Sequence, residues 1–340
     1  MGATVTTTVA GERLVFRCDG NERIGAGHVA RCIPLATAFA QLGWKVSFVG
    51  TYEGLAGWLL ARAKIDTCAA NQDLSCGVLA ERYDAVILDS YAIAPESICD
   101  LARRLPLATI AEANRCPTFG VLLDYHLDRI EQSNSRLLAG ASYAPLDPAL
   151  AGAGRARKEI GKVLVTVGGS RTARGLLDPI ASMSSLAFPD ADILCAGRAE
   201  SETNYLNRDR VIHLPSPSFL IDVLPDIDLA ITMAGLTAYE LACAGIPQVA
   251  IAIATNQRRV VNGLNRSGLA PCLDLTSGDS LAQLPAILER LRDAGLRACL
   301  AERGRKMFDG QGARRAAIAL TELYQAAGAK ECYRRRRSDS

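Results

Sequence analysis

The fold is decided by the stretch Ile231-Thr-Met-Ala-Gly-Leu-Thr-Ala-Tyr-Glu-Leu-Ala-Cys-Ala-Gly-Ile-Pro-Gln-Val-Ala-Ile-Ala-Ile-Ala-Thr-Asn-Gln257. Its two short apolar runs, Leu229–Thr232 and Val249–Ile253, predict buried strands. Between them a turn of small residues precedes a helix. Gly245 and Pro247 end that helix, as a glycine at the C-terminus and a following proline commonly do. The stretch therefore predicts one βαβ unit.

The start of this helix is a candidate anion site. Thr237 is of a type that favours the N-cap, and Glu240 follows at the capping-box spacing. The first amides of a helix have no intrahelical partner and lie beside a partial positive charge. We interpret the turn with Gly235 and Leu236 as a phosphate cradle; an ordinary crossover with a good cap is the alternative. Glu240 either closes the capping box or accepts hydrogen bonds from ribose hydroxyls.

Short apolar runs alternate with helical patterns along the whole chain, which predicts parallel sheets with helices on both faces. The pattern restarts after a small-residue, basic linker at 149–160. We expect two doubly wound Rossmann-like domains, residues 1–148 and 161–328, and a disordered basic tail at 329–340. Because ligands bind at the carboxyl ends of the strands in such domains, loops of both halves are expected to face an interdomain cleft.

Composition excludes several classes of protein. The 340 residues, 49% of them hydrophobic, can form two domains with their own cores. The formal charge of +2 argues against nucleic acid as the main partner. No apolar run approaches the length of a membrane span, and the N-terminus does not resemble a secretory signal. Eleven cysteines without a CxxC pair favour a reducing cytoplasm over a disulfide framework.

The chain has three histidines, His28, His126 and His213. His28 follows Gly25-Ala-Gly27 at the predicted start of a helix, where the helix dipole disfavours imidazolium. A neutral imidazole there can accept a proton, so His28 is the candidate general base, with a capping or packing role as the alternative. For His126 and His213 we expect packing. The spacing of the histidines shows no metal site, and no cofactor is predicted.

Three further positions are candidates because each follows a predicted strand. Gly168-Gly169-Ser170 is a second small turn, which offers amides to the same phosphates or simply allows tight packing. Asn256 can orient a water molecule or a sugar hydroxyl through its amide. Asp89 can bind a sugar hydroxyl or hold a loop.

Short motifs stand in order between about residues 13 and 270: Arg17-Cys-Asp19, Ile24-Gly-Ala-Gly-His-Val-Ala-Arg-Cys32, Asp89-Ser-Tyr91, Val167-Gly-Gly-Ser170, Gly235-Leu-Thr237 with Glu240, and Asn256-Gln257. Together they resemble the motifs of the UDP-sugar hydrolase of the pseudaminic acid pathway. That family has the GT-B fold and is related to the UDP-N-acetylglucosamine transferase of peptidoglycan synthesis.

The resemblance implies that the C-terminal half binds the nucleotide and the N-terminal half the sugar or acceptor. It implies His28 as the base that activates water and Asn256 as a residue that helps to place water or sugar. The implied nucleotide and phosphate ligands are Gly169, Ser170, Arg171, Gly235, Leu236, Thr237 and Glu240. The implied sugar or acceptor ligands are Asp19, Gly27, Arg31, Asp89, Tyr91 and Gln257.

The chain departs from the family at four places. Asp-His-Tyr of the family is Asp89-Ser90-Tyr91 here, and a later pair of aspartates is Glu112-Ala113. Both changes fall on the expected sugar side, so they leave the sugar and the acceptor open. Near the phosphates, Gly-Gly-Ser-Asp becomes Gly168-Gly-Ser-Arg171 and Gly-Gly-Ser-Thr becomes Ala234-Gly-Leu-Thr237.

Three functions remain in competition. The main hypothesis is inverting hydrolysis of a UDP-sugar at the anomeric carbon, which releases UDP and free sugar with His28 as base. The alternative is an inverting GT-B glycosyltransferase that moves the sugar to a small-molecule acceptor. A nucleotide-sugar sensor without catalysis is the third.

Overall fold

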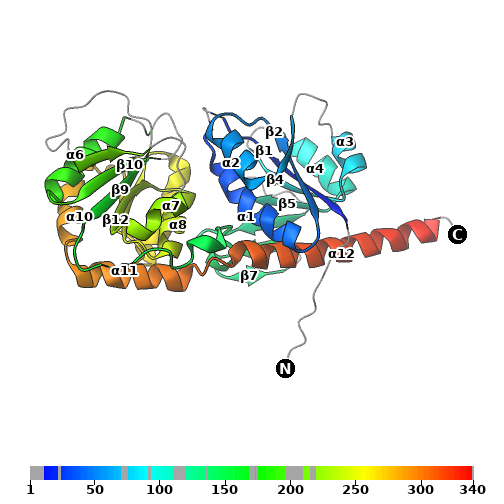
Figure 1. Ribbon diagram of the computed structural model, residues 1–340. Coiled ribbons are helices and arrows are strands. Elements are labelled where there is room, and N and C mark those ends of the chain that lie inside the picture. Colours follow the sequence, from blue (N-terminus) through cyan, green and yellow to red (C-terminus); the bar gives the residue numbers. More distant parts are fainter. Residues whose placement is uncertain are drawn as a thin grey trace.

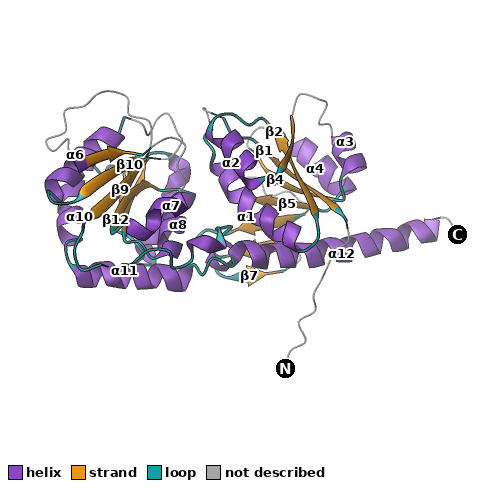
Figure 2. Ribbon diagram, in the orientation of Figure 1, coloured by secondary structure: helices purple, strands orange, loops and turns teal. Residues whose placement is uncertain are grey.

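The computed structural model describes residues 11–21, 24–69, 76–90, 93–110, 120–134, 136–155, 157–167, 173, 175–196, 210–214 and 220–338. These residues form two α/β lobes that lie side by side (Figure 1). The strands of each lobe lie between helices (Figure 2). The α/β prediction is therefore confirmed.

The first lobe is built on a sheet in the order β3-β2-β1-β4-β5-β6-β8-β7. All neighbours are parallel except β7 and β8. The strands are β1 (Arg13–Cys18), β2 (Lys45–Gly50), β3 (Asp66–Ala69), β4 (Ala85–Asp89), β5 (Leu107–Ile110), β6 (Val121–Asp124), β7 (Gln132–Ser133) and β8 (Leu137–Ala139). The helices are α1 (Gly27–Gln41), α2 (Leu55–Ala63), α3 (Cys76–Arg82) and α4 (Pro95–Arg104).

The second lobe is built on an all-parallel sheet in the order β11-β10-β9-β12-β13-β14. The strands are β9 (Lys162–Thr166), β10 (Asp192–Ala196), β11 (Val211–His213), β12 (Leu229–Met233), β13 (Gln248–Ala252) and β14 (Cys272–Asp274). The helices are α6 (Leu177–Ala187), α7 (Leu220–Val223), α8 (Leu236–Ala244), α9 (Arg258–Arg266), α10 (Leu284–Arg290), α11 (Ala294–Met307) and α12 (Gly312–Ser338).

Both sheets repeat one topology. In each lobe six strands that follow one another in the chain lie in the spatial order 3-2-1-4-5-6. From strand 1 the sheet grows first in one direction, to strands 2 and 3, and then in the other, to strands 4, 5 and 6, so the order reverses between strands 1 and 4. The reversal lies between β1 and β4 in the first lobe and between β9 and β12 in the second. In doubly wound sheets the carboxyl ends of the strands at this reversal form the ligand site. The topology therefore identifies the loops after these four strands as candidate site loops.

The strands at these reversals are covered on both sides, which explains their apolar sequences. Every residue of β4, β12 and β13 is buried. Parallel strands between two helix layers must be apolar on both faces, so they appear as continuous runs rather than as alternating patterns. The predicted strand Leu229–Thr232 is β12, which extends one residue further, and the predicted strand Val249–Ile253 is β13, which is shifted by one residue at each end.

The last helix joins the two lobes. α12 follows α11 of the second lobe and runs beneath the first lobe (Figure 1). There the indole Nε1 of Trp44 donates a hydrogen bond of 3.1 Å to Thr321 Oγ1, and the rings of Trp44 and Tyr324 meet edge to face at 6.1 Å. The sequence assigned this segment to the second domain, because a helical pattern does not show which surface the helix covers.

Three further details differ from the sequence prediction. α8 begins at Leu236 with Gly235 as its N-cap, so Thr237 lies inside the helix. The sequence pattern over 172–183 also predicts a helix, which the structure describes from Leu177 as α6, after a turn at 175–176; Thr172 lies outside the described residues. α12 runs to Ser338, so the segment from residue 329 that was predicted as a disordered tail is helical. Five short elements, β3, α3, α7, β7 and β8, were not predicted.

Candidate active site

The candidate base lies in a buried polar cluster at the carboxyl edge of the first sheet. His28 is in the first turn of α1, and Asp89 is the last residue of β4. His28 Nδ1 lies 2.8 Å from Asp89 Oδ1. Arg31, one turn further along α1, donates to both carboxylate oxygens, from Nε at 2.5 Å and from Nη2 at 2.6 Å. The structure thus brings the candidate base together with Arg31 and Asp89, two residues that the resemblance implied for the sugar or acceptor.

The tautomer of His28 depends on which partner its Nδ1 bonds. Burial alone would raise the pKa of Asp89, but the Arg31 guanidinium and His28 together lower it below its usual range. An ionised carboxylate only accepts hydrogen bonds, so a bond between Asp89 and Nδ1 requires a proton on that nitrogen. Nη2 of Arg31 also lies 2.8 Å from Nδ1 and can only donate, so a bond to it requires the other tautomer. With the proton on Nδ1, Nε2 is the nitrogen that accepts a proton. The ring is 7% exposed and lies against charged groups.

Asp19 and Gly27 have different environments. Asp19 accepts a hydrogen bond of 3.0 Å from the amide of Thr51 and pairs with Arg17 at 2.7 Å, so it holds the loop after β1 in place. Ser90, which stands where the family has histidine, donates to the same carboxylate at 3.1 Å. Gly27 is exposed, and a Cβ built on it would meet no other atom within 4 Å. Its backbone is therefore accessible at the start of α1.

The start of α8 in the second lobe is open. Gly235 is the N-cap, no side chain caps the helix, and a Cβ at Gly235 would meet nothing within 4 Å. The amides of Leu236 and Thr237 lie in the uncapped first turn, where helix amides lack intrahelical partners. The N-cap is Gly235, two residues before Thr237, so the predicted capping box is not formed. An uncapped first turn supports the interpretation as an anion site.

Glu240 is one turn further into α8 and is partly buried. Burial raises its pKa to about 7; a hydrogen bond from Thr237 opposes the rise and the nearby charge of Asp147 adds to it. The carboxyl group thus changes its charge close to neutral pH. Only in its ionised form do both of its oxygens act purely as hydrogen-bond acceptors.

The loop after β13 contributes an exposed and a structural residue. Asn256 lies in the 3-10 turn Thr255–Gln257 and is exposed to solvent. Gln257 uses its side-chain carbonyl to accept a 2.8 Å hydrogen bond from the amide of Ile253. Gln257, which the resemblance placed on the sugar, therefore holds the end of β13 through this oxygen.

Several candidates lie outside the described residues. They are Tyr91, the pair Glu112-Ala113, and the turn with Gly169, Ser170 and Arg171. The predicted roles of these residues remain predictions. The described neighbours of the turn, β9 and the start of α6, are at the reversal of the second sheet.

The carboxyl edges of the two sheets face each other. Asp124 ends β6, and its carboxylate accepts a hydrogen bond of 3.2 Å from Nη2 of Arg259, which follows the loop after β13. The next residue, Tyr125, meets Tyr239 of α8 edge to face at 6.1 Å. His126 is buried, stacks on Tyr125 and bonds Asp124 through Nδ1 at 2.9 Å, in agreement with the packing role expected for it.

Sequence reasoning missed Arg259 and the acids that it contacts. A basic residue directly after Asn256-Gln257 was the available signal, but its partners are more than a hundred positions earlier in the chain. Pairing across such a distance is a property of the fold. It cannot be inferred from spacing in one sequence.

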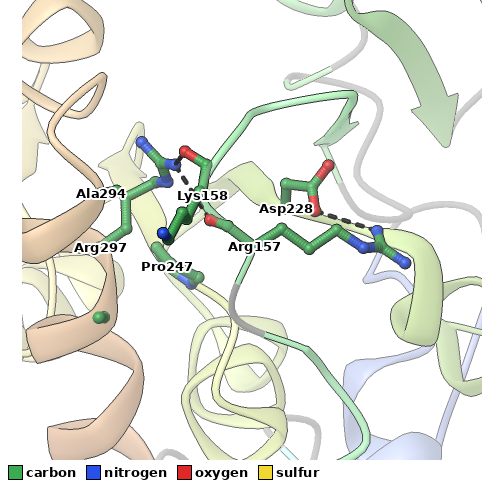
Figure 3. Close-up of a pocket in the computed structure, with 7 residues that line it drawn as sticks. Arg157, Lys158, Asp228, Pro247, Ala294 and Arg297 are labelled. Carbon is green, nitrogen blue, oxygen red and sulfur yellow. Dashed lines mark hydrogen bonds and ion pairs between the residues drawn. The ribbon is translucent and has the colours of Figure 1, made fainter.

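A hollow in the second lobe lies at the opposite edge of the sheet. It is lined by linker and helix residues, including Arg157, Lys158, Asp228 and Arg297 (Figure 3). Arg297 donates to the backbone carbonyl of Lys158 at 2.6 Å, and Asp228 pairs with Arg157 at 3.0 Å. Asp228 precedes β12, so the hollow is at the amino ends of the strands. The contacts of Arg297 and Asp228 that line the hollow hold the linker against the second lobe.

No group of three or more histidine, cysteine, aspartate or glutamate side chains among the described residues is arranged to hold a metal ion. No helix in this part of the chain has both the length and the apolar composition to span a bilayer.

No protein-family model matches the chain. Over 207 residues it is 25% identical to the spore coat polysaccharide biosynthesis protein SpsG of Bacillus subtilis (strain 168). The match covers 57% of this chain and 60% of SpsG, so the chain matches less than two-thirds of that relative's length.

Solved structures extend the likeness to nearly the whole chain. MurG of Acinetobacter baumannii superposes with a TM-score of 0.63 at 16% identity, over 92% of this chain and 99% of that one. The spinosyn forosaminyltransferase SpnP gives 0.62 at 14% identity, over 92% and 99%. MnaA of S. aureus, solved with UDP, gives 0.64 at 12% identity, over 90% and 94%. With the two repeated sheets, these likenesses show that the chain has the GT-B fold.

Proposed function

We propose that the protein is an enzyme of inverting glycosyl transfer that uses a UDP-sugar. The observation that carries the proposal is the pairing of His28 with Asp89 at one carboxyl edge, while the uncapped start of α8 lies at the facing edge. The first arrangement suits proton removal and the second suits a diphosphate. The GT-B fold, found also in a forosaminyltransferase and in a protein solved with UDP, supports the same assignment.

In this proposal Asp89 keeps the proton of His28 on Nδ1, and Nε2 takes a proton from the hydroxyl group that attacks. The attacking oxygen forms a bond to the anomeric carbon as the bond from that carbon to the UDP oxygen breaks. The bonding electrons leave with UDP, and the centre inverts. The charge that develops on the diphosphate meets amides of α8 that are already oriented, so little reorganisation is needed. Asn256 is proposed to place the attacking group or the sugar.

Two acceptors fit this chemistry. Transfer to a small-molecule acceptor is favoured by the transferase among the structural neighbours. Hydrolysis, in which water is the acceptor, is favoured by the motif resemblance around His28 and Asn256. Glu240 is proposed to bind the ribose, and Gly169, Ser170 and Arg171 to complete the phosphate site. Asp19, Gly27 and Tyr91 are proposed for the sugar side.

The test incubates the purified protein with a panel of UDP-sugars, first alone and then with alcohols or amines as acceptors. UDP release is measured by coupled assay and the sugar product by mass spectrometry. Release of UDP only in the presence of an acceptor identifies a transferase, whereas rapid release in water alone identifies a hydrolase. Binding of UDP-sugars without turnover under either condition would refute catalysis and leave the sensor hypothesis.

A further inference from the structure

Arg259 of the second lobe forms ion pairs with two carboxylates of the first, Asp124 and Asp128. The contact with Asp128 is bidentate: Nε of Arg259 lies 3.0 Å from Asp128 Oδ2, and Nη2 lies 2.7 Å from Asp128 Oδ1. The same Nη2 reaches Asp124 Oδ2 at 3.2 Å. Bidentate arginine–carboxylate pairs fix the orientation of the two groups as well as their distance. We call Arg259, Asp124 and Asp128 the α9 clasp.

The clasp is mechanically connected to the site. Arg259 is the second residue of α9, and that helix begins directly after the 3-10 turn that carries Asn256. Asp124 ends β6 of the first sheet. The clasp therefore ties the turn with Asn256 to the sheet whose β4 carries Asp89.

A close apolar contact accompanies the ion pair. Gly263 lies four residues after Arg259, on the same face of α9. A Cβ built on Gly263 would lie 2.7 Å from Leu127 Cβ, closer than such atoms approach in proteins. The absence of a side chain at Gly263 thus allows α9 to lie directly on the segment between the two acids.

The charged groups of the clasp can separate without leaving a buried charge unpaired. The Asp124 side chain is 1% exposed, but Arg129 and His126 also bond it, so it keeps partners when Arg259 leaves. Arg259 and Asp128 have side chains that are 32% and 28% exposed, so water can solvate both after separation. Breaking a fully buried pair would instead leave an uncompensated charge.

We infer that Arg259 is a positioning residue: its clasp on Asp128 and Asp124 sets the distance between the lobe with His28 and the lobe with the diphosphate site. The inference rests on the proposed function for its kinetic consequence, but its structural consequence can be measured without a substrate. A displacement of about 1 Å between reacting groups can reduce the rate about a hundredfold.

The test compares Arg259→Ala with Arg258→Ala. Arg258 is the preceding residue of α9 and pairs with Asp274 of its own lobe at 3.0 Å, so it is a matched control. We expect Arg259→Ala to lower kcat about ten- to a hundredfold and to leave the affinity for UDP alone within about threefold, while Arg258→Ala changes neither. In the double mutant Arg259→Ala/Asp128→Ala the loss should equal that of Arg259→Ala, because both changes break one pair.

A second variant opens the same contact without changing charge. Gly263→Ala places a methyl group against the Cβ of Leu127, and Gly263→Ala/Leu127→Gly removes the clash because glycine lacks that atom. Small-angle scattering of the ligand-free proteins should give a larger radius of gyration for Arg259→Ala and Gly263→Ala than for Arg258→Ala, with recovery in the Leu127 double mutant. Unchanged scattering of Arg259→Ala, or additive kinetic losses in the Asp128 cycle, would overturn the clasp. Lack of turnover by the unmodified protein would refute the proposed function but leave the scattering test valid.

Discussion

The two lobes share a topology but present opposite kinds of chemistry at the helix starts beside the reversals of their sheets. α1 follows the first strand of its sheet and brings His28 and Arg31 to Asp89, a cluster of charged, buried side chains. α8 follows a strand at the reversal of the other sheet and presents uncapped amides beside Gly235. Side chains can exchange protons, whereas backbone amides can only bind. The difference indicates that reaction and binding are divided between the lobes.

Replacement of the proposed base should give the largest effect. We expect His28→Ala to lower turnover of the UDP-sugar by about 10²–10⁴-fold, the usual contribution of a general base. Because the diphosphate site is on the other lobe, the affinity for UDP measured by calorimetry should stay near the value of the unmodified protein. Turnover close to that of the unmodified protein would remove His28 from the chemistry, and a parallel loss of UDP binding would refute the division between lobes.

Removal of the buried charge on Asp89 should reduce stability as well as turnover, because the same carboxylate is proposed to hold the His28 proton. Asp89→Asn leaves the guanidinium of Arg31, which is 3% exposed as a residue, without its carboxylate. Breaking a buried pair in this way costs about 3–5 kcal/mol of unfolding free energy. Urea denaturation at pH 7 measures the change.

An exposed pair of the second lobe is the control for this substitution. Asp226 pairs with Lys162 at 3.1 Å, and its side chain is 61% exposed. Asp226→Asn should leave the unfolding free energy nearly unchanged, as is usual for surface pairs. Equal effects of the two substitutions would mean that the first-lobe cluster is no more dependent on its charges than the protein surface is.

Two glycine substitutions test the binding half of the comparison. A Cβ at Gly235 or at Gly27 would meet no protein atom within 4 Å, so alanine should be accommodated at both helix starts. A methyl group at Gly235 would occupy the space proposed for the diphosphate, and we expect Gly235→Ala to weaken UDP binding roughly tenfold, about 1.4 kcal/mol. Gly27→Ala should leave UDP binding unchanged. Calorimetric titration with UDP distinguishes them, and equal affinities for both variants would place the diphosphate elsewhere.

The sequence predicted the parts of the fold that depend on local pattern. Buried strands such as β4 and β12 are continuous apolar runs, and their bounds came within one residue. Short elements with mixed composition, such as β3 and β7, carry no such pattern and were missed. The course of α12 was also missed, because its contact with Trp44 depends on how two distant surfaces meet.

The candidate site was predictable to the same degree. His28, Asp89 and Gly235 each stand at the end of a strong local pattern, and the structure places all three at carboxyl edges of the sheets. The contact between Arg31 and Asp89 joins residues 58 positions apart, so no spacing rule could find it. The sequence placed the N-cap of α8 two residues too late. Residue preference favours Thr237 as the N-cap, whereas the helix in the structure is preceded by Gly235.

The smallest expected effect concerns pH and Glu240. Burial raises the pKa of this carboxyl from its ordinary value of 4.5 to about 7. If Glu240 accepts hydrogen bonds from ribose as a carboxylate, the affinity for UDP should fall as pH decreases from 8 to 6. The stability of the ligand-free protein should change in the opposite direction, because a raised pKa favours the protonated folded state and stability is lost as pH rises through about 7. Glu240→Gln should therefore melt at a higher temperature than the unmodified protein at pH 8, bind UDP more weakly there, and bind it equally at pH 8 and pH 6. A persistent pH dependence of UDP affinity in Glu240→Gln would assign the titration to another group and leave α8 with backbone donors alone.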